Sequence, residues 1–133
     1  MTTNNFKTLN YAVDSEIATI TLDKPPLNLI NEDSTREYHR ALTLADEDPS
    51  VKVIILMGAG KGLSAGLDLK FLDSFDSVAM EKFLRLFYID TLKIVRGLSK
   101  PIIAAVHGYV REGACTLAFA CDLIIAGDDA DFG

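Results

Sequence analysis

The chain has 133 residues, of which 49% are hydrophobic and 24% are charged, a balance typical of a folded globular protein rather than a disordered one. Its net charge of −6 at pH 7 argues against nucleic-acid binding, because nucleic-acid binders usually carry a basic face. No apolar run reaches the length of a membrane span. We therefore expect neither a nucleic acid nor a membrane as a partner.

The N-terminal stretch MTTNNFKTLNY lacks the basic region and apolar run of a secretory signal peptide. Cys115 and Cys121 fall on one predicted helix about 9 Å apart along its axis, too far for a disulfide. We expect buried free thiols and a cytoplasmic protein. No His, Cys and Asp cluster has metal-ligand spacing, so no metal is expected.

The first predicted elements are a hairpin, a loop and a helix. Residues 6–23 alternate between apolar and polar around a turn at Asp14 and Ser15, which predicts two strands. Pro25 and Pro26 make the following KPPLNLI stretch a loop. Asn31 is the predicted N-cap of a helix that ends before Pro49. The apolar stripe of that helix is Tyr38, Ala41, Leu42 and Ala45.

The middle of the chain contains a strand, a glycine loop and two helices. Residues 51–58 form a short apolar run that predicts a buried strand. The glycine loop 59–66 follows, and Asp68 begins a short helix, where the helix dipole favours an acidic residue. Residues 77–98 are a predicted longer helix. Its predicted inward residues are Phe83, Leu84, Phe87, Leu92 and Val95.

The last third repeats the alternation of strand and helix. Residues 101–108 predict a buried strand, Gly113 opens a helix, and residues 122–127 predict a third strand. Ala114, Leu117, Ala118 and Cys121 form the apolar face of that helix. The order indicates an α/β fold in which helices cross between buried strands. Because the sequence ends abruptly after DADFG, we expect an incomplete unit with an exposed strand edge near DLIIAG.

Two stretches, GLSAGLDL and REGACTL, share one design. Each follows a predicted strand, bends at a glycine and opens a helix. If the two strands are neighbours, the backbone N–H groups of Leu67 and Gly113 converge and can bind a developing oxyanion. The alternative is that both loops only turn the chain. A nucleotide-binding α/β protein is a further alternative, although Leu63 stands where the dinucleotide fingerprint needs its third glycine and Lys61 comes too early for a P-loop.

The stretches VIILMGAGKGLSAGLDLKFL and KPIIAAVHGYVREGACTLAFACDLIIAGDDADFG closely resemble the enoyl-CoA hydratase/isomerase (crotonase) family, and the resemblance covers essentially the whole chain. It implies that residues 1–133 are the N-terminal part of a single acyl-CoA-binding domain, a spiral of ββα units incomplete at the C-terminus. It also implies an acyl-CoA thioester as substrate, no separate cofactor because coenzyme A belongs to the substrate, and a homotrimer or hexamer in the full-length protein.

The resemblance carries site residues to this chain by position. The backbone N–H groups of Leu67 and Gly113 would hold the thioester oxygen and steady an enolate. The groove for coenzyme A would be lined by Leu27, Ala65, Asp68, Leu69 and Lys70. Among the cations near these loops, Lys70 is the favoured phosphate contact, whereas Lys24 and Lys61 are interpreted as solvated.

The sequence departs from the family pattern at two positions. Thr116 stands where hydratases usually have their first catalytic glutamate, and threonine cannot act as a general acid or base near neutral pH. We interpret its hydroxyl as bonded to a carbonyl one turn earlier, with orientation of a water as the alternative. Glu112 stands beside the proposed donor of Gly113. We expect it to point to solvent or to pair with Arg111 or another cation, with a relocated acid/base, or a side chain directed toward coenzyme A or an oligomer partner, as alternatives.

The other candidate side chains have structural interpretations. Asp122 is expected to make a structural hydrogen bond, His107 to be a satisfied core histidine, and His39 to lie on the polar side of its helix. The leading hypothesis is an acyl-CoA enzyme that isomerises a double bond with one base rather than hydrating it with two glutamates. The alternative is a non-catalytic member that binds acyl-CoA or serves as a structural subunit.

Overall fold

The computed structural model describes residues 2–3 and 6–133, and it contains a large sheet of six strands in the order β1-β2-β3-β4-β6-β8. The strands β1, β2 and β3 are antiparallel, whereas β3, β4, β6 and β8 run parallel. Their bounds are Thr2–Thr3 for β1, Leu9–Asp14 for β2, Ile17–Leu22 for β3, Val53–Gly58 for β4, Ile102–Val106 for β6 and Leu123–Ala126 for β8. The expected hairpin is confirmed as β2 and β3.

A second, smaller sheet consists of β5 (Gly62–Ser64), β7 (Tyr109–Val110) and β9 (Asp131–Phe132) in parallel. Along the chain, β4 is followed by β5, β6 by β7, and β8 by β9, so each pair gives one strand to each sheet. Helices follow the first two pairs. This arrangement is the expected spiral of ββα units.

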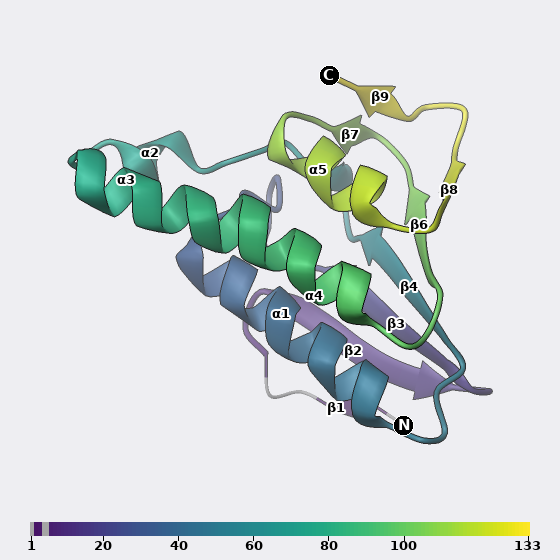
Figure 1. Ribbon diagram of the computed structural model, residues 1–133. Helices are drawn as coiled ribbons and strands as arrows, with labels where there is room; N and C mark the ends of the chain where they lie inside the picture. Colours follow the sequence, from purple (N-terminus) through teal and green to yellow (C-terminus); the bar gives the residue numbers. More distant parts are fainter. Residues whose placement is uncertain (1, 4–5) are drawn as a thin grey trace.

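The helices gather on one side of the large sheet, with α1 across the hairpin strands and a long helical segment beside it (Figure 1). This segment, residues 77–97, is called the rod below. The rod changes character along its length, because a π-helical segment separates two α-helical ones. The bounds are Glu32–Glu47 for α1, Leu69–Leu72 for α2, Ser77–Leu84 for α3, Arg85–Asp90 for the π-helix η1, Thr91–Gly97 for α4 and Gly113–Ala120 for α5.

The helix α1 begins as its sequence predicts. The Asn31 side chain accepts a hydrogen bond from the Ser34 N–H, and the Ser34 hydroxyl accepts one from the Asn31 N–H, so the two residues form a capping box. The predicted stripe of Tyr38, Ala41, Leu42 and Ala45 is buried. It packs in one core cluster with residues of the large sheet.

One inward residue of the long rod was predicted incorrectly. Leu92 is 40% exposed, whereas Thr91 beside it is 1% exposed. Thr91 lies four residues from both Phe87 and Val95, which are buried, so the helical period places Thr91 on the inner face. Its hydroxyl tolerates burial because it lies 2.7 Å from Nε2 of His39.

The strand β8 forms one edge of the large sheet, with β6 as its neighbour. Leu123 and Ile125 on this strand are 61% and 64% exposed. The exposed strand edge expected at DLIIAG is therefore present. Among the described residues, no helix has the length and apolar character needed to cross a bilayer.

Candidate active site

The two glycine turns lie next to each other at the ends of neighbouring strands. Ser64, the last residue of β5, pairs with Val110, the last residue of β7, in parallel. The Arg111 N–H then donates to the Ser64 carbonyl at 3.1 Å. The strands that lead directly into the turns are thus the short β5 and β7 of the smaller sheet, whereas the sequence pointed to β4 and β6, which are also parallel neighbours.

The proline loop lies against the first glycine turn. The Ala65 N–H donates to the Leu27 carbonyl at 3.0 Å, and the Ile30 N–H donates to the Gly66 carbonyl at 2.9 Å. The Asp68 N–H donates to the Ile30 carbonyl at 2.8 Å. Of the groove residues carried over by resemblance, Leu27, Ala65 and Asp68 therefore belong to one hydrogen-bonded surface, while Leu69 and Lys70 follow as exposed residues of α2.

Two glycines allow this close approach. Gly66 has a φ of +114°, and a Cβ there would lie 2.9 Å from Oε1 of Glu112. A Cβ on Gly113 would lie 3.3 Å from Cδ2 of Leu67 and 3.1 Å from two ring carbons of Phe87. The second turn therefore packs directly against the first turn and against the rod.

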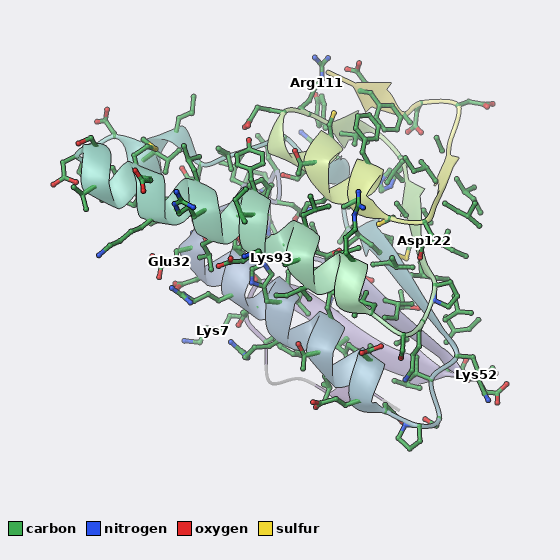
Figure 2. All side chains as sticks on the ribbon, in the orientation of Figure 1. Lys7, Glu32, Lys52, Lys93, Arg111 and Asp122 are labelled. Atoms are coloured by element: carbon green, nitrogen blue, oxygen red, sulfur yellow. The ribbon has the colours of Figure 1, made fainter. Side chains whose placement is uncertain are left out.

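Glu112 points into the space between the turns. Its Oε1 accepts the Leu67 N–H at 2.8 Å, and its Oε2 accepts the Tyr88 hydroxyl at 3.1 Å. Glu112 is exposed, as expected, but it does not pair with Arg111, which pairs instead with Asp131 at the outer edge of the molecule (Figure 2). The reason is that an N–H group at a turn binds a carboxylate strongly when one is within reach.

The backbone and the neighbours of Glu112 hold the side chain in this direction. Glu112 has a φ of +51°, a conformation uncommon for a residue with a side chain. Burial, together with the charge and the hydrogen bond of Glu112, raises the pKa of Tyr88, so the phenol stays a proton donor to the carboxylate. Tyr88 belongs to η1, and single-turn π segments are frequent at functional sites.

The Gly113 N–H and the Thr116 hydroxyl both lack a hydrogen-bond partner among the described residues. The expected bond from the Thr116 hydroxyl to a carbonyl one turn earlier is therefore not formed. Thr116 is half-buried and, with Tyr88 and Leu92, lines an open groove of about 790 Å³ between the rod and α5.

The lysines near the loops differ from one another. Lys24 is not simply solvated as expected, because its Nζ donates to the Leu29 carbonyl at 3.4 Å and lies 3.9 Å from Oδ2 of Asp68. Asp68 also caps α2 by accepting the Phe71 N–H, which confirms its predicted role at a helix start. Lys61 and Lys70 are exposed.

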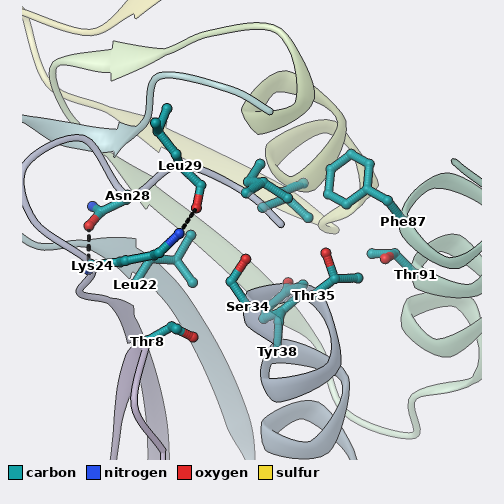
Figure 3. A pocket seen from close by; sticks show the side chains of 12 residues that line it. Thr8, Leu22, Lys24, Asn28, Leu29, Ser34, Thr35, Tyr38, Phe87 and Thr91 are labelled. Carbon is teal, nitrogen blue, oxygen red and sulfur yellow. Dashed lines mark hydrogen bonds between the residues drawn. The ribbon is translucent and has the colours of Figure 1, made fainter. Parts of the chain in front are cut away.

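A small cavity lies behind the proline loop (Figure 3). Its volume is about 20 Å³, which has room for a single water and not for an acyl group. The Tyr38 hydroxyl at this cavity is buried without a hydrogen-bond partner among the described residues, and burial raises its pKa well above the usual value. The cavity is lined by Thr8, Leu22, Lys24, Asn28, Leu29, Ile30, Ser34, Thr35, Tyr38, Phe87, Thr91 and Leu117.

The remaining candidate side chains have structural roles. Asp122 accepts the Ile102 N–H at 2.8 Å, as expected. His107 lies 2.8 Å from the Gly60 carbonyl, so it has the expected partner, but it is half-buried rather than a core residue. His39 does not lie on a polar helix side as predicted, since it contacts Thr91 and its burial lowers its pKa. Cys115 and Cys121 are free but only half-buried. No group of three His, Cys, Asp or Glu residues in the described part of the chain could hold a metal ion.

Two residues near the site were not found from the sequence. Asn28 is buried with a φ of +52°, and its side-chain amide donates to the carbonyls of Ala59, Gly62 and Leu63. It fixes the proline loop to the glycine loop. From the sequence, Tyr88 is predicted only as part of the helix 77–98, with no role in the site. An asparagine in a proline loop is a weak signal, and nothing in the local pattern distinguishes Tyr88 from other half-buried aromatic residues.

Comparison with known proteins identifies the class. Residues 12–133 match the family Enoyl-CoA hydratase/isomerase. The chain is 32% identical over 122 residues to crotonyl-CoA hydratase of Syntrophomonas wolfei, covering 90% of this chain and 46% of that protein. It is 38% identical over 122 residues to the mitochondrial enoyl-CoA hydratase of Pongo abelii, covering 90% of this chain and 40% of the relative.

Solved structures give the same result. A probable enoyl-CoA hydratase from Mycobacterium smegmatis superposes with a TM-score of 0.86 at 40% identity, covering 95% of this chain and 51% of that chain. An enoyl-CoA hydratase/carnithine racemase from Magnetospirillum magneticum superposes with a TM-score of 0.90 at 27% identity, covering 97% and 49%. The chain belongs to the enoyl-CoA hydratase/isomerase family and has the crotonase fold. It spans about half the length of the curated relatives it matches.

Proposed function

We propose that this protein processes acyl-CoA thioesters, with the backbone N–H groups of Leu67 and Gly113 binding the thioester oxygen and stabilising an enolate. The observation that carries the proposal is the hydrogen bond of 2.8 Å between the Leu67 N–H and Oε1 of Glu112. An anionic oxygen already occupies a position suited to the oxygen of a thioester. The Gly113 N–H lies on the adjacent turn without a partner among the described residues.

The reaction favoured by the residues is double-bond isomerisation. Isomerisation needs one base that moves a proton between two carbons, whereas hydratases of this family usually use two carboxylates. In this chain Thr116 stands at the position of the first of those two carboxylates, and threonine cannot act as a general acid or base near neutral pH. The loop near Leu27 and the segment from Ala65 to Lys70 form the proposed coenzyme A groove, since they are hydrogen-bonded to each other.

Hydration is the second candidate, because the relatives from Syntrophomonas wolfei and Pongo abelii are named hydratases. A non-catalytic acyl-CoA-binding or structural member is the third, favoured by the occupation of the Leu67 N–H by Glu112. In all three, coenzyme A arrives with the substrate and no separate cofactor is required. We also propose a cytoplasmic homotrimer or hexamer, whose contacts would cover exposed apolar residues such as Phe119 and Ile125.

The test is an assay of the protein against 2-enoyl-CoA and 3-enoyl-CoA thioesters of several chain lengths. Isomerisation is expected as a shift of the double bond without a gain of water, and mass spectrometry separates it from hydration. Hydration alone would replace the first candidate with the second. Binding of acyl-CoA without turnover would leave the non-catalytic member, and light scattering on the same sample gives the number of subunits.

A further inference from the structure

The N–H groups of Leu67 and Gly113 form the proposed binding site for the thioester carbonyl, called the carbonyl site below. Among the described residues, Glu112 is the one acidic residue whose carboxylate accepts a hydrogen bond from either of them. The residue is exposed, so an incoming thioester can reach it. Its second oxygen accepts the Tyr88 hydroxyl at 3.1 Å. When a thioester oxygen takes the Leu67 N–H, this second bond can still hold the carboxylate beside the acyl group.

The backbone adds an independent observation. Glu112 keeps a φ of +51° although glycine adopts such a conformation without strain. Strained backbone of this kind clusters where a side chain must point in a functional direction. Here the direction is toward the carbonyl site, and Thr116, one helical turn further along, offers only a hydroxyl.

We propose that Glu112 is the catalytic acid/base of this site, and that in the ligand-free protein it occupies the Leu67 N–H that the thioester oxygen later takes over. The inference rests on the proposed function and deepens it by naming the base. The Tyr88 hydroxyl acts as a positioning group that holds the carboxylate.

The proton transfer balances without any further reactant. The bond between the acyl α-carbon and its hydrogen breaks, and the proton goes to the Glu112 carboxylate. The electron pair of that bond forms the double bond of the enolate, and the thioester oxygen takes the negative charge. Glu112 then returns the proton to the α-carbon, or to the γ-carbon when the acyl chain carries a 3,4 double bond.

Electrostatics is consistent with this order of events. A carboxylate that stayed ionised beside the thioester oxygen would oppose the developing negative charge. When the carboxylate accepts the α-proton, it becomes neutral in the step that places charge on the oxygen. The repulsion therefore falls as the enolate forms.

The experiment measures exchange of the α-protons of butyryl-CoA in D₂O by proton NMR, because exchange needs only the carbonyl site and the base. Glu112→Gln keeps the size and an acceptor oxygen but removes the basicity. We expect exchange to slow by about 100-fold or more while butyryl-CoA affinity is retained or improved. Glu81→Gln is the matched control, since Glu81 is an exposed acid paired with Arg85 on the rod.

Two further variants complete the test. Glu112→Gly suits the φ of +51°, so it should fold even if the glutamine variant does not, and it should bind butyryl-CoA more tightly with equally slow exchange. Tyr88→Phe should lower the exchange rate and alter its pH profile, while leaving affinity unchanged. Exchange at the wild-type rate in Glu112→Gln or Glu112→Gly overturns the role of Glu112 alone. Failure of the wild-type protein to bind butyryl-CoA overturns the proposed function and this inference together.

Discussion

Gly113 lies against the ring of Phe87, so closely that a Cβ added to the glycine would come within 3.1 Å of two ring carbons. Phe87 is 1% exposed and belongs to η1, the segment that also carries Tyr88. The contact brings the first residue of α5 next to the rod and next to Leu67. The absence of a side chain at Gly113 therefore allows the two turns to lie close together, and Phe87 of the rod packs against the second turn.

The first prediction separates the N–H of Gly113 from its missing side chain. Gly113→Pro removes the N–H and is expected to lower kcat by about 100-fold or more. Gly113→Ala keeps the N–H and adds only a Cβ that presses on Phe87, so it should cost about 1–3 kcal/mol of stability with a much smaller loss of kcat. Kinetics with circular dichroism on both variants measures this, and equal kcat values for the two would contradict a role for the N–H.

The second prediction concerns the carboxylate of Glu37, which fastens α1 to the start of β2. It accepts the N–H groups of Lys7 and Thr8 and the Thr8 hydroxyl, at 2.6 to 3.0 Å. Glu37→Gln leaves part of this set unpaired and should lower the free energy of unfolding by about 1–3 kcal/mol. Glu47→Gln, an exposed change on the same helix, should stay within about 0.5 kcal/mol. Urea denaturation compares the two.

The third prediction is the pH dependence of the same group. Burial tends to raise the pKa of Glu37, but the hydrogen bonds from Thr8 and Lys7 and the charge of Arg40 prevail and lower it. A carboxyl with a lowered folded pKa stabilises the protein above its unfolded pKa, and this stability is lost as the pH falls through the folded value. The difference in the free energy of unfolding between the wild-type protein and Glu37→Gln should therefore shrink below about pH 4. An unchanged difference down to pH 3 would contradict this.

The parts of the fold that follow long periodic patterns were predictable. The cap at Asn31, the stripe of α1 and the strands β2, β3, β4 and β6 each extend over several residues, so their spacing is visible. The strands β5, β7 and β9 have three, two and two residues, too few to show any period. The ββα repeat depends on these short strands and was found in the sequence only through resemblance to the family.

The sequence predicted the two glycine turns, which lie side by side in the structure, but not the contacts of the Glu112 side chain. The positions of Leu67 and Gly113 follow from glycine turns after strands, which is local information. The direction of Glu112 depends on two partners distant in sequence, the Leu67 N–H and the Tyr88 hydroxyl. The general preference of charged residues for solvent predicted its exposure but not these two hydrogen bonds.

The fourth prediction addresses the exposed edge at β8. Ile125 is 64% exposed on an edge strand beside Leu123 and Ile124, an arrangement that favours pairing with another chain. Ile125→Lys should reduce self-association of residues 1–133, whereas Val78→Lys, a similar change at a 62% exposed position on α3, should not. Light scattering over a range of concentrations measures this. A monomeric wild-type chain at high concentration would show that the edge does not drive association.

The last prediction concerns Thr116, whose hydroxyl has no hydrogen-bond partner among the described residues. Because no hydrogen bond is lost, Thr116→Val should change the free energy of unfolding by less than about 0.5 kcal/mol. Because threonine cannot transfer protons near neutral pH, kcat on a 3-enoyl-CoA should also stay within about twofold. Thermal unfolding and steady-state kinetics test both, with Thr116→Ser as the control that keeps the hydroxyl. If Thr116→Val abolishes turnover while Thr116→Ser retains it, and both variants keep their fold and acyl-CoA affinity, the hydroxyl positions a reacting water. The isomerase would then give way to a hydratase of altered design.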